Sequence, residues 1–148
     1  MRIAPYNVEW FANLFDARGR LLEDGEWSAR YNVTRADQLA SLGIVFTAMN
    51  ADAVMIIEAP ENGRKRQTVP MLERFAARYD LRCRKAILGF DNETQQEIAM
   101  LYDPDALTLT HDPRGGGEGE APRFDQTYMM DLDFDATLDT VTFNKPPL

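Results

Sequence analysis

Ala51-Asp-Ala-Val-Met-Ile-Ile-Glu58 is the stretch that decides the fold, because five consecutive apolar residues in it lead to a single carboxylate. A continuous apolar run of this length indicates a strand that is covered on both faces. A second segment, Ile3-Ala-Pro-Tyr-Asn7, also has the pattern of a strand and also ends in a polar residue. We therefore expect two buried strands, residues 2–8 and 53–57, that each deliver a polar side chain at the carboxyl end.

A helix is expected between these strands, from about Thr34 to Asn50. Thr34 can cap the helix, and Asp37 three residues later approximates a capping box. One apolar stripe repeats at helical spacing and consists of Leu39, Leu42, Val45, Phe46 and Met49. The order strand, helix, strand is a βαβ unit, so the two strands are predicted to be parallel neighbours.

The rest of the chain predicts a second helix and then mostly antiparallel strands. The helix is expected over Thr68–Tyr79, with Pro70 in its first turn. Short strands are expected at Arg82–Leu88, Glu97–Tyr102, Leu107–His111, Phe124–Phe134 and Asp139–Phe143, the last two as a hairpin. The sequence therefore predicts an α/β fold, in which an early βαβ unit is followed by a largely antiparallel meander.

The length, composition and net charge of the chain exclude some classes of protein. The chain has 148 residues, which is enough for one domain with a core. No apolar stretch approaches the roughly 18 residues of a membrane span. The net charge of −8 argues against tight non-specific binding of nucleic acid, which depends on Lys and Arg. The N-terminus lacks a signal-peptide pattern and the single Cys83 fits a reducing compartment, so we expect a cytoplasmic protein.

Glu58 is the strongest candidate for a functional residue. In open α/β sheets, ligands bind outside the carboxyl ends of the strands, which is where we expect Glu58. A carboxylate there is a hard oxygen ligand suited to Mg²⁺ or Mn²⁺. Asn7 is expected beside it, at the end of the neighbouring strand. Each residue also has a structural interpretation, with Asn7 capping a loop and Glu58 simply exposed where its strand ends.

These two segments resemble the N-terminal half of the endonuclease/exonuclease/phosphatase superfamily, whose fold is that of deoxyribonuclease I. That family begins with a strand ending in Asn, here Asn7. A helix follows, and then Ala-Asp, an apolar run and Gln-Glu, here Ala51-Asp52 to Ile57-Glu58. A later strand of the type Ile98-Ala-Met-Leu-Tyr102 extends the resemblance over most of residues 1–102. One position departs from the pattern, since Ile57 replaces the usual Gln before the Glu.

The resemblance implies a metal-dependent phosphoesterase built as part of a four-layer αββα sandwich. In it, Glu58 and Asn7 would be the catalytic and metal-binding residues, with Mg²⁺ or Mn²⁺ as the cofactor. The substrate would be a phosphodiester or phosphomonoester, either in nucleic acid or in a small phosphorylated metabolite.

Members of the family also have a second half with a His-bearing strand, an Asp-x-Asn motif and an Asp-His pair. Residues 1–148 contain no counterpart of these groups. We therefore expect a single partial domain, a fragment that is inactive alone. The alternative is a non-enzymatic domain that forms homo-oligomers or binds a partner protein through an exposed sheet.

Several other side chains are weaker candidates for this neighbourhood. Glu9 shares the strand face of Asn7, and Gln95 and Gln96 precede a predicted strand that borders the cleft. Arg64-Lys-Arg66 could meet a phosphate, although a solvated loop is the simpler interpretation. His111 is the only histidine, lacks the family context and is interpreted as a surface or structural residue.

Two further sequence patterns, one acidic and one glycine-rich, are not predicted to be ligand-binding sites. Asp131, Asp133 and Asp135 alternate, but an EF-hand loop would need Gly and Glu where Ala136 and Thr142 stand. We interpret the three aspartates as a solvated strand face. The glycines at 115–117 lie in an expected flexible loop, and no Lys-Ser/Thr of a phosphate loop follows them.

Overall fold

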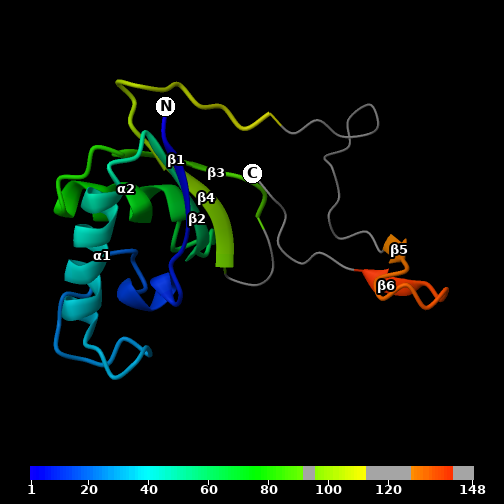
Figure 1. Ribbon diagram of the computed structural model, residues 1–148. Helices are drawn as coiled ribbons and strands as arrows, with labels where there is room; N and C mark the ends of the chain where they lie inside the picture. The colour runs from blue at the N-terminus through cyan, green and yellow to red at the C-terminus, as the bar shows by residue number, and fades with distance from the viewer. Residues whose placement is uncertain (92–95, 113–127, 142–148) are drawn as a thin grey trace.

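The computed structural model describes residues 1–91, 96–112 and 128–141 (Figure 1). Within them, the chain has the α/β architecture that the sequence predicts. The elements in chain order are β1 (Ile3–Asn7), the 3-10 helix η1 (Phe11–Leu14), α1 (Arg35–Met49), β2 (Ala53–Pro60), α2 (Thr68–Arg78), β3 (Lys85–Leu88), β4 (Gln96–Tyr102), β5 (Tyr128–Met130) and β6 (Asp139–Val141).

A four-stranded mixed sheet organises the fold, with its strands in the order β1-β2-β4-β3. β1 and β2 are parallel, and their register places Asn7 opposite Ile57. β4 runs antiparallel to both β2 and β3. The prediction of a βαβ unit followed by antiparallel strands is therefore confirmed, and β2 is an interior strand between β1 and β4.

α1 begins and ends where the sequence indicates. Thr34 Oγ1 accepts a hydrogen bond from the Asp37 N–H at 3.1 Å and donates to the Asp37 carboxylate at 2.6 Å. Asn50 ends the helix in the left-handed conformation, with φ of 42°, which Asn adopts more readily than most residues. In the described part of the chain, neither helix has the length and apolar character needed to cross a bilayer.

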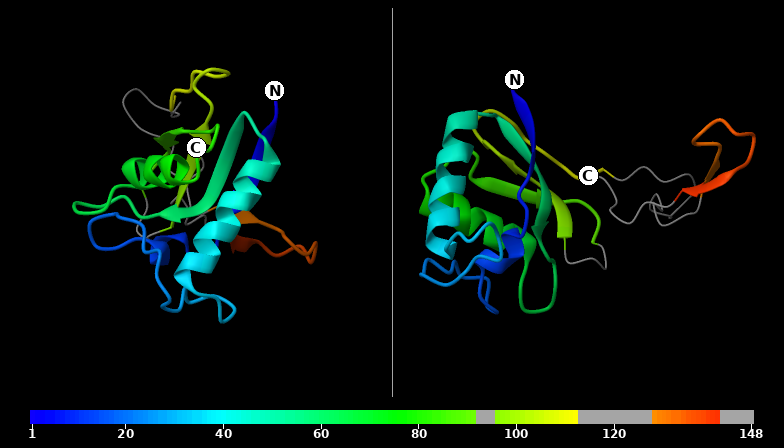
Figure 2. Two further views of the ribbon diagram at one scale, coloured as in Figure 1. Left: turned by 90° about the vertical axis from the view of Figure 1, so that its left-hand side faces the viewer. Right: turned by 60° about the horizontal axis from the view of Figure 1, so that its bottom comes forward.

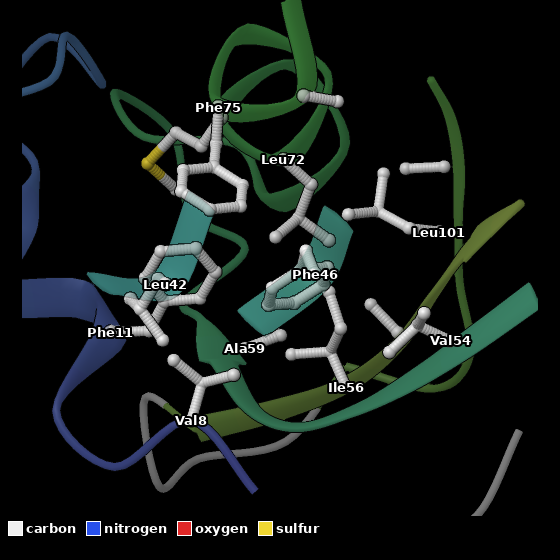
Figure 3. Close-up of a cluster of buried hydrophobic side chains, with 14 of the residues drawn as sticks. Val8, Phe11, Leu42, Phe46, Val54, Ile56, Ala59, Leu72, Phe75 and Leu101 are labelled. Carbon is white, nitrogen blue, oxygen red and sulfur yellow. The ribbon is translucent and has the colours of Figure 1, made fainter. Parts of the chain in front are cut away.

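Both helices pack on the same face of the sheet, as Figures 1 and 2 show. Their buried side chains meet in one cluster above β2 (Figure 3). Phe75 of α2 lies at its centre, with its ring 5.2 Å from that of Phe11 and 5.3 Å from that of Phe46, edge to face in both cases. Each such pair contributes about 0.5–1.5 kcal/mol beyond area burial, so Phe75 joins η1, α1 and α2 into one layer.

The opposite face of the sheet, which we call the outer face, carries no helix in the described residues (Figure 1). Strand alternation assigns residues to it, since Glu97, Ala99 and Leu101 of β4 are buried towards the helices. The residues between them, Ile98 and Met100, are only half-buried. Apolar side chains from four strands share this face: Ile3, Met55, Ile57, Ile87, Ile98 and Met100.

The strand predicted at Leu107–His111 is wrong. After β4 the chain makes a turn in which Asp103 O accepts the N–H groups of Ala106 and Leu107 at 3.1 and 2.9 Å. Residues 107–111 then alternate between half-buried and exposed, but they join no strand ladder in the described residues. The alternating sequence pattern of these residues reflects a segment that packs one side on the domain and forms no hydrogen bonds of a sheet.

The strand predicted at Phe124–Phe134 is confirmed at Tyr128–Met130 and is wrong after it, because β5 ends at Met130. Asp131 carboxylate oxygens accept the N–H groups of Asp135 and Ala136 at 3.2 and 3.0 Å, which fixes a turn there. Phe134 consequently lies in that turn and is 91% exposed. The predicted hairpin partner is confirmed as β6, which pairs antiparallel with β5.

We predict that Gly43→Ala lowers the free energy of unfolding by about 1–3 kcal/mol, the usual cost of overpacking. A Cβ at Gly43 would lie 2.4 Å from Cδ1 of Tyr79, where α1 crosses the end of α2. The better helix propensity of Ala, worth about 1 kcal/mol, offsets only part of this clash. Urea unfolding measures the difference, with Gly25→Ala as the control because a Cβ there meets nothing within 4 Å. Equal effects at both positions would contradict the close helix contact.

Candidate functional site

Three polar side chains gather at one end of the sheet, where the parallel strands β1 and β2 have their carboxyl ends. Asn7 is the last residue of β1, Glu58 lies near the end of β2, and Gln96 is the first residue of the antiparallel β4. The register explains the meeting, since Asn7 is opposite Ile57 and Gln96 is opposite Pro60. The structure thus brings together the two residues that the sequence singled out and adds Gln96 to them.

Glu58 is the extra residue of a β-bulge. The register between β2 and β4 shifts between Ile57 and Ala59, so Glu58 has no partner residue in the ladder. Its φ of 63° is left-handed, which is uncommon for any residue with a Cβ. Such backbone conformations cost about 1–3 kcal/mol and occur often at functional sites.

The bulge decides which face of the sheet receives the carboxylate. Val54 and Ile56 are buried against the helices, so simple alternation would send residue 58 into the core as well. Instead Ala59 takes the next buried position, opposite the buried Glu97. Glu58 is therefore placed on the outer face together with Asn7 and Gln96, which follow the outer alternation of their own strands.

The two amides hold the two oxygens of the carboxylate. Gln96 Nε2 donates to Glu58 Oε2 at 3.1 Å, and Asn7 Nδ2 donates to Glu58 Oε1 at 3.4 Å, which is long for a hydrogen bond. Asn7 is exposed, whereas Glu58 and Gln96 are half-buried. The cluster therefore presents one oriented carboxylate and two amides at an accessible edge.

Glu97 lies under this cluster and was missed as a special residue by the sequence analysis. It is 1% exposed, and its Oε1 accepts the Asn62 N–H at 3.3 Å. Asn62 also donates to Asp91 at 2.9 Å. The sequence of β4 could have predicted this burial, because in a strand residue 97 shares a face with the apolar residues 99 and 101.

The loop after β2 is fixed on its other side by Arg66. The Arg66 guanidinium donates to Ala12 O at 2.5 Å and pairs with Glu61 at 3.0 Å, which joins the loop to η1. Of the three predicted cations, Arg66 is thus part of the loop structure, while Arg64 and Lys65 are exposed. The loop borders the candidate site through the Asn62 N–H, which donates to Glu97.

The other predicted neighbours lie elsewhere or outside the described residues. Glu9 forms an ion pair with Arg30. The His111 ring packs edge to face on Phe90, with ring centroids 4.8 Å apart, in keeping with its predicted structural role. Gln95, the glycines at 115–117, and residues 142–148 lie outside the described part of the chain.

The aspartates near the end of the described chain do not form a strand face as predicted. Asp131 and Asp133 lie in the turn between β5 and β6, and they approach Asp139 of β6 closely enough to share an ion. The Asp131 carboxylate accepts hydrogen bonds from the N–H groups of Asp135 and Ala136, and these bonds account for this turn by themselves. Acidic clusters of this kind are common on protein surfaces, and we assign no site to it.

The opposite end of the sheet is an ion-pair cluster centred on Asp52. Its carboxylate accepts the Arg2 N–H at 2.6 Å and the Arg82 guanidinium at 2.6 Å. The hydrogen bond from the Arg2 N–H has the largest effect and the Arg82 guanidinium a smaller one, and both hold the pKa of Asp52 below its usual value. A depressed pKa stabilises the fold above the unfolded-state pKa, and this contribution is lost as the pH falls through the folded-state pKa. The cluster therefore secures the start of β1 at neutral pH, far from the candidate site.

The comparisons with known proteins identify no relatives. No family model matches the chain, and neither a curated protein nor a solved structure matches it.

We predict that Glu58→Gly is more stable than Glu58→Ala by about 1 kcal/mol. Both variants lose the same side-chain hydrogen bonds, but only glycine adopts the left-handed conformation without strain. Chemical denaturation of both variants measures the difference. Met55→Gly and Met55→Ala form the matched control at a regular position of β2, where Ala should be the more stable by about 0.5–1 kcal/mol. The same order of stability at both positions would show that the bulge is absent.

Proposed function

We propose that Asn7, Glu58 and Gln96 form the metal-binding wall of a phosphoesterase site of the endonuclease/exonuclease/phosphatase type. The observation that carries this proposal is the bulge at Glu58. It is a strained backbone conformation whose visible consequence is to place a carboxylate between two amides on an accessible edge. A structural Glu at a strand end would need neither the strain nor the two partners.

The donor set fits a hard divalent cation. A carboxylate and two amide groups offer only oxygen ligands to a metal, which suits Mg²⁺ or Mn²⁺ and disfavours softer ions. Glu58 would hold the ion, and the amides of Asn7 and Gln96 would orient its carboxylate or a substrate phosphate. A bound divalent ion would supply charge stabilisation to the phosphoryl oxygens.

Gln96 provides an amide beside Glu58, where the chain departs from the family pattern. The family places a Gln directly before its Glu, and Ile57 stands at that position here. Ile57 pairs with Ile98 on the apolar outer face, while Gln96 reaches Glu58 from the neighbouring strand. An amide beside the carboxylate is thus present, although it comes from β4 instead of β2, and this supports the assignment of Glu58.

The cluster does not supply a general base. Amides do not accept a proton at neutral pH, and Glu58 would be occupied by the metal. The single histidine packs on Phe90. The proposal therefore gives Asn7, Glu58 and Gln96 the tasks of holding the metal and positioning a phosphoester, and leaves water activation to other groups.

We also propose that the outer face packs against a second sheet, as in a four-layer αββα sandwich. Six apolar side chains on that face, with no helix over them in the described residues, support this arrangement. Sheets that bury an apolar face in this way pack about 10 Å apart. The second layer would also enclose the cluster at Glu58 and exclude water from it.

A non-enzymatic binding domain is the second candidate function, and the same outer face favours it. The free edge of β1 is a weaker basis for self-association. Arg2 and Val8 form backbone hydrogen bonds with β2, and in a parallel strand every second residue does so. The backbone groups of residue 5 therefore point towards the edge of β1 that no described strand pairs with. Pro5 has no N–H to offer there, which weakens pairing with another strand. Sedimentation of residues 1–148 tests self-association, because a monomer at high concentration would exclude homo-oligomers that form through the outer face.

We predict that Glu58→Gln weakens Mn²⁺ binding more than tenfold and that Gln96→Leu weakens it by about tenfold. Loss of a group that orients a metal ligand typically costs about 10–100-fold in affinity, and loss of the ligand itself costs at least as much. Electron paramagnetic resonance of free Mn²⁺ measures the binding.

Two variants serve as controls for this experiment. Glu26→Gln removes an exposed carboxylate elsewhere and should leave the affinity unchanged. Asp133→Asn distinguishes Mn²⁺ that binds to the aspartates of the turn between β5 and β6 from Mn²⁺ that binds at Glu58. If Mn²⁺ binds equally well to the unchanged chain and to Glu58→Gln, the proposed metal site is excluded.

A further inference from the structure

The apolar side chains on the outer face of the sheet form one contiguous area. Strand register makes them neighbours, since Met100 of β4 lies opposite Met55 of β2 on one side and opposite Ile87 of β3 on the other. Ile3 extends the area to the edge strand β1 and is 53% exposed. Contiguous apolar areas on a protein surface mark sites of contact with another molecule.

The β5–β6 hairpin, residues 128–141, carries a second apolar area. More than half of the surface of each of its large apolar side chains is exposed, and these are Met129, Met130, Leu132, Phe134 and Leu138. A hairpin of two short strands is only marginally stable in water by itself. The hairpin therefore needs a surface on which these side chains pack.

The position of the hairpin leaves both apolar areas open to another molecule. It stands apart from the sheet of its own chain, as Figure 1 shows. In Figure 1 and in the right-hand view of Figure 2, it lies on the side away from both helices, which is the side of the outer face. A second copy of the chain can thus meet the hairpin where it stands, whereas contact with its own sheet requires a different placement.

The charge of the hairpin indicates what kind of surface it fits. Residues 128–141 contain four aspartates and no Lys or Arg. Arg64 and Lys65 are exposed in the loop after β2, and neither forms an ion pair in the part of the chain that the structure describes. This loop follows the end of β2 at which Ile57 and Ile98 are paired. The chain therefore offers both an apolar area and positive charge to an acidic, apolar hairpin.

We propose that the hairpin of one copy of this chain packs on the outer face of a second copy, which returns the same contact. Exchange of one element between identical chains is a low-cost route to a two-fold dimer. Each copy then buries the apolar side chains of its outer face and of its hairpin, and this burial drives the association. The hairpin would supply strands to the second layer that we propose over the outer face. The dimer does not depend on the metal site at Glu58.

Sedimentation equilibrium of the full chain measures the dissociation constant of the dimer. Leu138→Ser in the hairpin and Ile3→Ser on the outer face should each raise it by at least about tenfold, because each removes apolar burial from both contacts. Ile44→Ser makes a similar change on α1, at a position that is 70% exposed, and should leave the constant unchanged. All three side chains are more than half exposed, so the core of the monomer is retained in each variant.

A spin label distinguishes a second copy from the sheet of the same chain. The label is attached to Thr137→Cys in a Cys83→Ala background, and this chain is mixed with isotope-labelled chain that carries no spin label. The amide signals of Met55 and Met100 in the isotope-labelled chain should broaden as the spin-labelled chain is added. The amide signal of Ala40, which is exposed on α1, should keep its intensity.

Three results would overturn the proposal: a monomer at high concentration, equal effects of Leu138→Ser and Ile44→Ser, or unchanged signals of Met55 and Met100 in the mixed sample. None of these measurements involves Mn²⁺, so failure of the dimer and failure of the metal site give different results.

Discussion

The interior position of β2 is the constraint on which the rest of the structure depends. Hydrogen bonds to β1 on one side and β4 on the other fix its register, and the helices bury Val54, Ile56 and Ala59 on one face. Residue 58 is in phase with the buried Val54 and Ile56, so β2 can place it on the outer face only by interrupting its alternation. The bulge at Glu58 is that interruption, and it lets one strand keep an apolar inner face and still present a carboxylate on the outer face.

The same geometry explains how a few residues acquire several tasks. Gln96 and Glu97 are neighbours in β4, yet alternation sends Gln96 to the carboxylate of Glu58 and Glu97 to the N–H of Asn62 beneath it. Asn7 stands at the edge of the sheet, where it contacts Glu58 and also lines a hollow between the end of β1 and α1.

Much of the fold could be predicted because its signals are local. The Thr34 cap, the stop at Asn50 and the apolar run of β2 depend on short-range chemistry, and each is found where the sequence indicated. Residues 107–111 and 131–134 could not be assigned from alternation, because a strand also requires a partner with free hydrogen-bonding groups. For residues 131–134, the side chain of Asp131 competes for those groups and closes a turn.

The sequence by itself determined that a βαβ unit would bring Asn7 and Glu58 to the same end of a sheet, because the hydrophobic pattern and the helix caps are encoded residue by residue. Only the tertiary structure decided the face on which Glu58 lies, since that depends on the register against β4 and on a left-handed backbone. It also decided that Gln96 of β4 donates to the Glu58 carboxylate. Both outcomes arise from pairing between strands that are about forty residues apart in the chain, and such pairing leaves no mark in the local sequence.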